Sequence, residues 1–328
     1  MAQSGIGVSG FGATADGRAV QKVTMGCGDF TASVLTFGSV LQSVRMADVW
    51  HDLTLGSDRI ADYEGGMRYH GSLIGPVVNR ISGATAQLDG RTLRFEANQD
   101  GRHCLHSGSA GTHLKHWRLA EATDTTCILT LALPDGEGGF PGNRRITARW
   151  EVERPATLRL EVTVTTDAPT FVNFANHSYW NLDGSESWAG HKLRVAASEV
   201  LPTTDEFVPT GEIAPVAGGP LDFRSGKTVA PGSPPLDNCF VLGREREMLR
   251  DVLWLEGRSG VAMTVATTEP GIQVYDGRAA VRPGRRSYEG LAVEAQYWPD
   301  APAHGEFPSI RLDRDEAYVH VTEWRFRA

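Results

Sequence analysis

The chain has 328 residues, 41% of them hydrophobic, and its formal net charge is −8 at pH 7. A chain of this size can bury a large core, while the negative charge and the lack of clustered lysines and arginines exclude nucleic acids and anionic membrane surfaces as expected partners. No apolar run approaches the roughly 20 residues that a membrane-spanning helix requires.

Alternation of apolar and polar residues predicts β-strands along most of the chain. The clearest of them are, in chain order, residues 127–133, 157–165, 260–266 and 318–326. Glycines and prolines separate such segments, and the pairs Asp89-Gly90 and Asp135-Gly136 indicate tight turns. The best helical pattern, in residues 244–255, is weak.

No linker, repeat or change of composition divides the chain. We therefore expect residues 1–328 to form a single domain. Many strands without convincing helices predict an all-β protein, in the form of a large antiparallel β-sandwich.

The four cysteines are scattered and form no C-x-x-C pair. This pattern is typical of reduced thiols rather than of a disulfide framework. The first residues lack the charged and apolar regions of a secretory signal peptide. Together these features lead us to expect a cytoplasmic protein.

The segment ANHSYWNL, residues 175–182, places His177 among aromatic and amide side chains. A histidine in such surroundings is suited to proton transfer, because its pKa is readily shifted across the neutral range. Tyr179 and Trp180 are expected to pack in the core. A histidine that transfers protons needs a second titratable group close to it.

A second unusual segment, residues 290–300, carries Glu294 inside an apolar run. In a strand, Val293 and Glu294 point to opposite faces. Burying an unpaired carboxylate costs several kcal/mol, so we expect Glu294 to face a polar cleft. If His177 shares that cleft, the two side chains form an acid/base pair, and the nearby carboxylate should raise the pKa of the histidine.

A metal site is an alternative use for the histidine-rich segment that contains His103, His106, His113 and His116. Residues three apart share a face on a helix but point to opposite faces of a strand. The surrounding pattern is typical of strands and loops, so we expect no metal. The glycine-rich segment at residues 135–142 lacks a phosphate-binding spacing and predicts a hairpin loop.

Several ordered segments resemble the motifs of the aldose 1-epimerases, the galactose mutarotase family. They are GPVVNRISGATAQLDG, CLHSGSAG, DGEGGFPGN, ANHSYWNL, LPTTDEFVPTGEIAPV, PGIQVYDG and LAVEAQYWPDAPAHGEFPSIRL. The resemblance extends from Leu35 to the end of the chain. Their order makes the signal strong, since each motif alone is modest.

The resemblance implies a galactose mutarotase-like sandwich, of the type called a supersandwich, and interconversion of the α and β anomers of a free aldose. Glu294 matches the family's base at the anomeric hydroxyl, and His177 matches its acid at the ring oxygen. Two positioned proton carriers suffice for this reaction, each contributing about 10²–10⁴-fold. No cofactor or metal is therefore expected.

The same resemblance assigns substrate-binding roles to five residues. Asn79 and Arg80 match an Asn-Arg pair whose amide and guanidinium suit sugar hydroxyls. His106 matches a histidine donor, and Asp237 an aspartate ahead of an aromatic residue, in a register that a one-residue slip would change. Gln273 shares a strand face with a tyrosine two residues later.

Two other functions remain open at this stage. One is a carbohydrate-binding protein without catalysis, and the other is a glycosidase or lyase that uses Asp237 and Glu294 as a carboxylate pair. Pro76, Ser107 and Thr112 depart from the family pattern, which leaves open the choice among galactose, glucose and pentoses. The sequence gives no indication of oligomeric state, pathway or organism.

Overall fold

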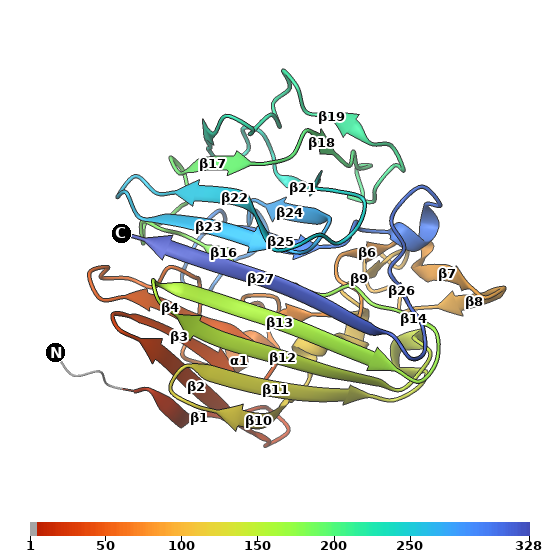
Figure 1. Cartoon of the computed structure of the whole chain (residues 1–328), viewed down its shortest axis with the longest axis horizontal. Helices are drawn as coiled ribbons and strands as arrows, with labels where there is room; N and C mark the ends of the chain where they lie inside the picture. The colour runs from red at the N-terminus through yellow and green to blue at the C-terminus, as the bar shows by residue number, and fades with distance from the viewer. Residues whose placement is uncertain (1–4) are drawn as a thin grey trace.

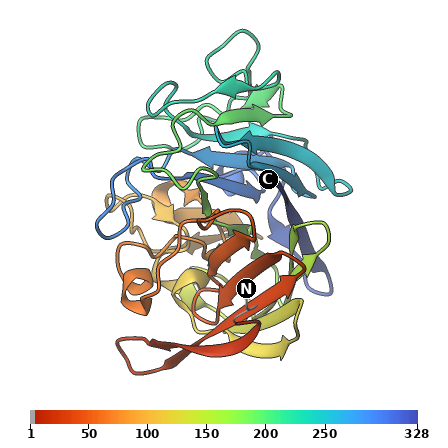
Figure 2. The same ribbon diagram turned by 90° about the vertical axis from the view of Figure 1, so that its left-hand side faces the viewer.

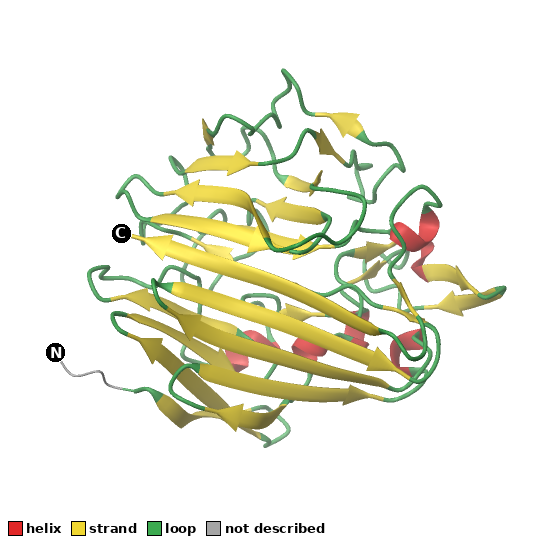
Figure 3. Cartoon of the chain, viewed as in Figure 1, coloured by secondary structure: helices red, strands yellow, loops and turns green. Residues whose placement is uncertain are grey.

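Residues 5–328, which the computed structural model describes, form strands joined by loops and a few short helices (Figure 3). The first four residues of the predicted domain lie outside the described part. The helices are α1 (Ile60–Glu64) and the 3-10 turns η1 (Ser82–Ala84), η2 (Gly108–Ala110), η3 (Thr112–Leu114), η4 (Glu137–Gly139) and η5 (Ala301–Ala303). No helix in residues 5–328 has the length and apolar character needed to cross a membrane.

One large antiparallel sheet contains the longest strands of the described residues. Its members are, in spatial order, β10 (Arg118–Ala122), β11 (Thr126–Leu133), β12 (Arg144–Glu153), β13 (Thr157–Thr166), β27 (Ala317–Arg327), β23 (Ala262–Thr267), β22 (Arg250–Glu256), β17 (Lys192–Val195) and β20 (Lys227–Thr228). Figure 1 shows β27, β13, β12 and β11 side by side across the molecule. The four segments with predicted alternation correspond to β11, β13, β23 and β27 of this sheet, which confirms them as strands, although β23 begins two residues later than predicted.

Two further antiparallel sheets accompany it. One has the order β1 (Gly7–Ala13), β2 (Ala19–Cys27), β3 (Phe30–Leu35) and β4 (Leu41–Met46). The other has the order β16 (Tyr179–Trp180), β25 (Leu291–Gln296), β24 (Gly271–Tyr275), β21 (Asp237–Val241), β18 (Glu199–Val200) and β19 (Ala214–Pro215).

Short two-stranded ladders are formed in addition to these sheets. They are β14 (Thr170–Phe171) with β26 (Arg311–Leu312), β15 (Ala175–Asn176) with β5 (Leu73–Ile74), β6 (Arg80–Ile81) with β9 (Cys104–Leu105), and β7 (Thr85–Leu88) with β8 (Arg91–Arg94). In both Figure 1 and Figure 2, β1–β4 occupy the lower part of the molecule and the strands from β17 to β24 the upper part.

The core lies between the large sheet and the two smaller ones. In β13, Leu158 and Leu160 are fully buried while Arg159 is partly exposed, as the alternation predicts. The main hydrophobic cluster joins such residues to Val23 of β2 and Leu291 of β25. The predicted antiparallel β-sandwich is therefore confirmed.

Two local predictions have opposite outcomes. Asp89 and Gly90 form the turn between β7 and β8, both with positive φ (49° and 73°), as an Asp-Gly hairpin turn requires. The weak helical pattern of residues 244–255 is misleading, because Arg250–Glu256 is strand β22. There, pairing with β17 and β23 outweighs the local helical preference.

Candidate active site

A cavity of about 390 Å³ has walls formed by β6, β9, β16, β21, β24 and β25 and by loops, among them the loop between α1 and β5 and the loop between β18 and β19. All but one of the residues predicted to act on or bind a substrate line this cavity. They are Asn79, Arg80, His106, His177, Asp237 and Glu294. Segments separated by more than two hundred residues in the chain thus contribute to one polar site.

Glu294 enters the cavity from a strand that is buried on both faces. Leu291 and Val293 of β25 point into the main hydrophobic cluster, so the alternating geometry of the strand turns Glu294 to the opposite side. Its register is fixed by pairing with Gln273 of β24. The prediction that Glu294 faces a polar cleft is confirmed.

His177 lies between β15 and β16 and is held by its main chain. Its N–H donates to the carbonyl oxygen of Ser72 at 2.9 Å, and its own carbonyl accepts from the N–H of Gly71 at 3.0 Å. Trp180 belongs to the main core, as expected. Tyr179 is also buried, but it lines the cavity as well.

The two proposed proton carriers face each other in the cavity. Nε2 of His177 lies 3.6 Å from Oε1 of Glu294, and their exposed fractions are 4% and 2%. Nδ1 of His177 and Oε2 of Glu294 have no hydrogen-bond partner in the described residues. Buried polar atoms are normally paired, so this geometry leaves bonding capacity for a ligand.

Burial governs the protonation of both groups. It raises the pKa of Glu294 well above its usual value, and the negative charge of Asp237 adds to this effect while Arg80 opposes it. Burial lowers the pKa of His177 to about 4. We expected the neighbouring carboxylate to raise the pKa of the histidine; this was wrong, because loss of solvation outweighs a carboxylate that is itself biased toward its neutral form.

Arg80, Asp237 and Gln273 form a connected group at one end of the site. Nη2 of Arg80 lies 3.9 Å from Oδ2 of Asp237, while Oδ1 of Asp237 accepts a hydrogen bond of 2.6 Å from Nε2 of Gln273. Burial raises the pKa of Asp237, and Arg80 and Gln273 counteract the rise. Gln273 does not line the cavity, so the geometry indicates that it orients Asp237 rather than contacting a sugar.

His106 and Asn79 fix each other in left-handed backbone conformations, with φ of 53° and 64°. The N–H of His106 donates to the carbonyl of Asn79 at 2.8 Å, and the N–H of Asn79 donates to Nδ1 of His106 at 3.1 Å. Nδ1 is therefore the acceptor, and Nε2 carries the proton of the neutral ring. Burial first, then His177, His113 and Arg80, hold the pKa of His106 well below its usual value.

Several lining residues were not predicted from the sequence. They are Arg68, Tyr69, His70, Phe207 and Arg278, whereas Tyr275, which also lines the cavity, is the tyrosine predicted to share a strand face with Gln273. Aromatic rings suit the C–H faces of a sugar, and Arg80 lies over the ring of Phe207 at 5.3 Å. The pair Tyr69-His70 gave no sequence signal beyond its nearness to Asn79-Arg80.

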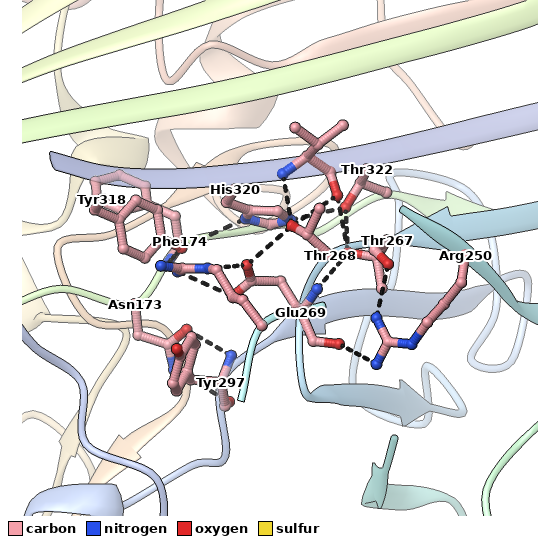
Figure 4. Close-up of polar contacts among 12 residues, drawn as sticks. Asn173, Phe174, Arg250, Thr267, Thr268, Glu269, Tyr297, Tyr318, His320 and Thr322 are labelled. Carbon is pink, nitrogen blue, oxygen red and sulfur yellow. Dashed lines mark hydrogen bonds and ion pairs between the residues drawn. The ribbon is translucent and has the colours of Figure 1, made fainter. Parts of the chain in front are cut away.

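A reciprocal contact joins Asn173, which precedes His177 in the chain, to Tyr297, which follows Glu294 (Figure 4). Nδ2 of Asn173 donates to the carbonyl of Tyr297 at 3.2 Å, and the N–H of Tyr297 donates to Oδ1 of Asn173 at 2.9 Å. These contacts lie within a few residues of both proton carriers in the chain. They hold the two segments in register.

His103 and His116, at the two ends of the histidine-rich segment, have separate structural partners. Nδ1 of His103 accepts from the N–H of Gly83 at 3.2 Å, and Nε2 of His116 lies 3.1 Å from the hydroxyl of Thr14. Within residues 5–328, no group of three or more His, Cys, Asp or Glu side chains is placed to hold a metal ion.

Comparison with known proteins agrees with this geometry. The family model described as aldose 1-epimerase matches residues 21–325. The chain is 30% identical to the aldose 1-epimerase of Escherichia coli (strain K12) over 320 residues, which cover 90% of this chain and 92% of that protein. It is also 30% identical to the galactose mutarotase of Sus scrofa, with 94% of each chain covered.

A solved structure supports the same relationship. The aldose epimerase homologue from C. elegans superposes with a TM-score of 0.87 at 27% identity, covering 94% of this chain and 99% of that one. The galactose mutarotase-like form of the predicted sandwich is thereby confirmed. The chain belongs to the aldose 1-epimerase family, whose members are isomerases that interconvert the α and β anomers of aldoses.

Proposed function

We propose that Glu294 and His177 carry out the anomer interconversion as base and acid on a free aldose bound in the cavity. The observation that carries this proposal is their 3.6 Å approach with unpartnered atoms on each. General acid and base catalysis requires groups within reach of the same substrate atoms. Buried bonding capacity on both supports this use.

The reaction conserves the protons of the pair. Ionised Glu294 takes the proton of the anomeric hydroxyl, and protonated His177 gives its proton to the ring oxygen as the bond from C1 to that oxygen breaks. The open-chain aldehyde turns about the C1–C2 bond. The former ring oxygen, now a hydroxyl, then attacks the other face of C1. As the ring closes, this hydroxyl returns its proton to His177, and Glu294 returns its proton to O1.

Burial favours the neutral pair, whereas ring opening starts from the charged pair. These two forms hold the same single proton and differ only in its position. A short shift within 3.6 Å, direct or through the sugar hydroxyl, converts one into the other. The pair is therefore best treated as one titrating unit.

Asn79, Arg80, His106 and Asp237 are proposed to bind the sugar hydroxyls, with Gln273 orienting Asp237. Their donors and acceptors are mixed, as a polyhydroxyl ligand requires. Galactose is the first substrate to test, because relatives at about this level of identity are galactose mutarotases. Glucose and arabinose are the next candidates.

We also propose that residues 1–328 act as one domain in the cytoplasm. The main hydrophobic cluster, which combines Val23 of β2 with Phe326 of β27, supports a single unit. All four cysteines are free, which is typical of a reducing compartment.

Polarimetry tests the proposed function. The protein should accelerate the change in optical rotation of freshly dissolved α-galactose, α-glucose or α-arabinose, with EDTA having no effect. Methyl α-galactoside should be inert, because its methylated O1 lacks the hydroxyl proton that Glu294 would remove. Release of methanol from that glycoside would instead favour a glycosidase, and binding without acceleration would favour a carbohydrate-binding protein.

A further inference from the structure

His70 is a buried histidine in the cavity wall that the proposed reaction does not use. It lies between α1 and β5, and its side chain lines the cavity with an exposed fraction of 2%. Neither ring nitrogen has a hydrogen-bond partner within residues 5–328. Most buried polar side-chain atoms are paired, so two unpartnered nitrogens on one ring indicate a missing partner.

The ring of His70 packs close to the proposed acid, His177, through a shared neighbour. Its centroid lies 4.4 Å from that of Tyr179, and the His177 ring lies 5.1 Å from the same tyrosine. The ring of Tyr179 therefore contacts both imidazole rings. A ligand bound next to His177 is within reach of His70.

The main chain beside His70 is closely packed and hydrogen-bonded at Gly71. Gly71 has φ of 71°, and a side chain there would collide with the carbonyl of Leu41. The carbonyl of Gly71 accepts from Nδ2 of Asn176 at 2.8 Å, and its N–H donates to the carbonyl of His177 at 3.0 Å. The segment is thus tied directly to the residues that carry the proposed acid.

The chemistry of the ring defines its partner. Burial, with smaller contributions from His177 and Arg282, lowers the pKa of His70 to about 3. The ring is neutral near pH 7 and offers one N–H donor and one acceptor nitrogen. A hydroxyl group is also both donor and acceptor, whereas an anion only accepts.

We propose that His70 is a substrate-binding residue that recognises one hydroxyl group of the aldose on the side of the cavity formed by Tyr179, and so sets the sugar specificity of the reaction. This inference rests on the proposed function of the cavity as a site for a free aldose. In the empty protein the unpaired nitrogens are unfavourable. A sugar hydroxyl removes that cost, while a sugar without it does not.

The test is a set of binding measurements with deoxy sugars. Isothermal titration calorimetry would give Kd for galactose and for its 2-, 3-, 4- and 6-deoxy analogues, each equilibrated between anomers so that turnover releases no heat. Another aldose replaces galactose if polarimetry shows it to be the better substrate. His70→Phe keeps a flat ring against Tyr179 but removes both nitrogens.

His70→Phe should weaken binding of the parent sugar about 10-fold, which is a typical value for neutral hydrogen bonds. One deoxy analogue should bind equally well to wild type and to His70→Phe, because it lacks the hydroxyl group with which His70 would form a hydrogen bond. His70→Asn and His70→Gln, which restore a donor and an acceptor, should recover part of the affinity. Without sugar, the Tm of His70→Phe should equal or exceed that of wild type.

His113→Phe is the matched control. His113 is also buried, has an unpartnered Nδ1 and has a pKa lowered to about 3, but it is not among the residues that line the cavity. Its replacement should leave the deoxy-sugar pattern unchanged. An equal loss for the parent and every deoxy analogue in His70→Phe, or no loss at all, would overturn the inference.

Failure of the proposed function gives a different result. A wild-type protein that binds aldoses without accelerating their mutarotation would refute catalysis while the deoxy-sugar pattern still tests His70. A wild-type protein that accelerates mutarotation but shows no analogue dependence at His70 would refute only this inference.

Discussion

Two buried clusters of this protein contain the same kinds of side chain, a glutamate, an arginine, histidine and tyrosine, yet they differ in how their polar atoms are paired. In the cluster around Glu269, Nε and Nη2 of Arg246 donate to its carboxylate at 2.6 and 3.3 Å. Arg246 lies over the ring of Tyr318 at 3.9 Å. His320 is 2.7 Å from the hydroxyl of Thr322 (Figure 4).

The second cluster consists of Glu294, the residues of the cavity around it and Gln273, which pairs with Glu294 in the neighbouring strand. Among the described residues, Oε2 of Glu294, Nδ1 of His177, Oε1 of Gln273 and both nitrogens of His70 have no partner. No such atom belongs to Glu269, Arg246, Tyr318 or His320. The difference does not lie in residue type, since both clusters are buried and polar.

Unpaired buried polar groups reduce stability, and a paired network stabilises one arrangement of the core. We infer that the Glu269 cluster supports the fold, while the Glu294 cluster keeps bonding capacity for a ligand. Substitutions should therefore separate the two by their effects, with activity lost in one and stability lost in the other.

The largest effect is expected at the proton carriers. Glu294→Gln and His177→Asn should each lower kcat at least about 10²-fold, because each removes a proton transfer. KM should change less, since Gln has the size and shape of Glu and Asn keeps an amide near the position of the His177 ring. Polarimetry with the best aldose substrate measures both constants.

Thermal unfolding provides the complementary measurement for these variants. For Glu294→Gln, Tm should remain equal to or above that of wild type, because the replacement breaks no protein hydrogen bond of the side chain. His177→Asn also removes ring contacts with Tyr69 and Tyr179, so a small decrease in Tm is expected there. A variant with wild-type kcat would remove that residue from its proposed role. A large drop in Tm would show that the Glu294 cluster, like the Glu269 cluster, supports the fold.

The next effect is expected on stability. Glu269→Ala leaves the guanidinium of Arg246 between Tyr297 and Tyr318 without its carboxylate. Loss of one partner of a buried ion pair costs about 3–5 kcal/mol. Urea unfolding should therefore show a lower free energy of unfolding, while kcat of the folded fraction changes less than in Glu294→Gln.

Glu269→Gln is the control for this change, because it keeps the acceptor oxygen and the size of the side chain. It should lose less stability than Glu269→Ala. Equal stability of wild type and Glu269→Ala would show that pairing in this cluster does not support the fold.

A smaller effect distinguishes contact from orientation within the cavity. Arg80→Ala should raise KM about 10-fold or more, since it removes charge-assisted hydrogen bonds to substrate. Gln273→Ala should raise KM only about 2- to 10-fold, because Gln273 acts through Asp237. If Gln273→Ala had the larger effect, the glutamine would contact the sugar after all, as the sequence resemblance implied.

The sequence predicted those parts of the fold that depend on local pattern. Alternation identified β13 because its apolar residues face one core, and Asp89-Gly90 identified a hairpin because the turn needs positive φ. The local pattern misjudged residues 244–255, because pairing with strands distant in the sequence decides their conformation. Local propensity carries no information on such partners.

The residues of the site also fall into those that the sequence pattern predicted and those that only the folded structure reveals. His177 and Glu294 were predicted because a histidine and a carboxylate are unusual in apolar segments. His70 was missed, since only the folded cavity shows that its nitrogens lack partners. The pKa direction of His177 was wrong, because it depends on burial, which the presence of a nearby carboxylate does not reveal.

The pH dependence offers the finest test of the unpaired cluster. The proposed mechanism requires one proton on the pair of Glu294 and His177. As the pH falls, the neutral pair gains a second proton at His177, whose pKa is about 4, and the base is lost. As the pH rises through the elevated pKa of Glu294, the pair loses its only proton and the acid is lost. A plot of kcat/KM against pH should therefore be bell-shaped.

Two substitutions should move the alkaline limb of this profile in opposite directions. The charge of Asp237 raises the pKa of Glu294, so Asp237→Asn should shift that limb to lower pH; Arg80 lowers the same pKa, so Arg80→Met should shift it to higher pH. Each shift should be about one pH unit, as for a nearby charge. The acid limb should stay in place, since neither residue contributes to the pKa shift of His177. Measured kcat/KM profiles in which both variants move the alkaline limb the same way would assign it to a group other than Glu294.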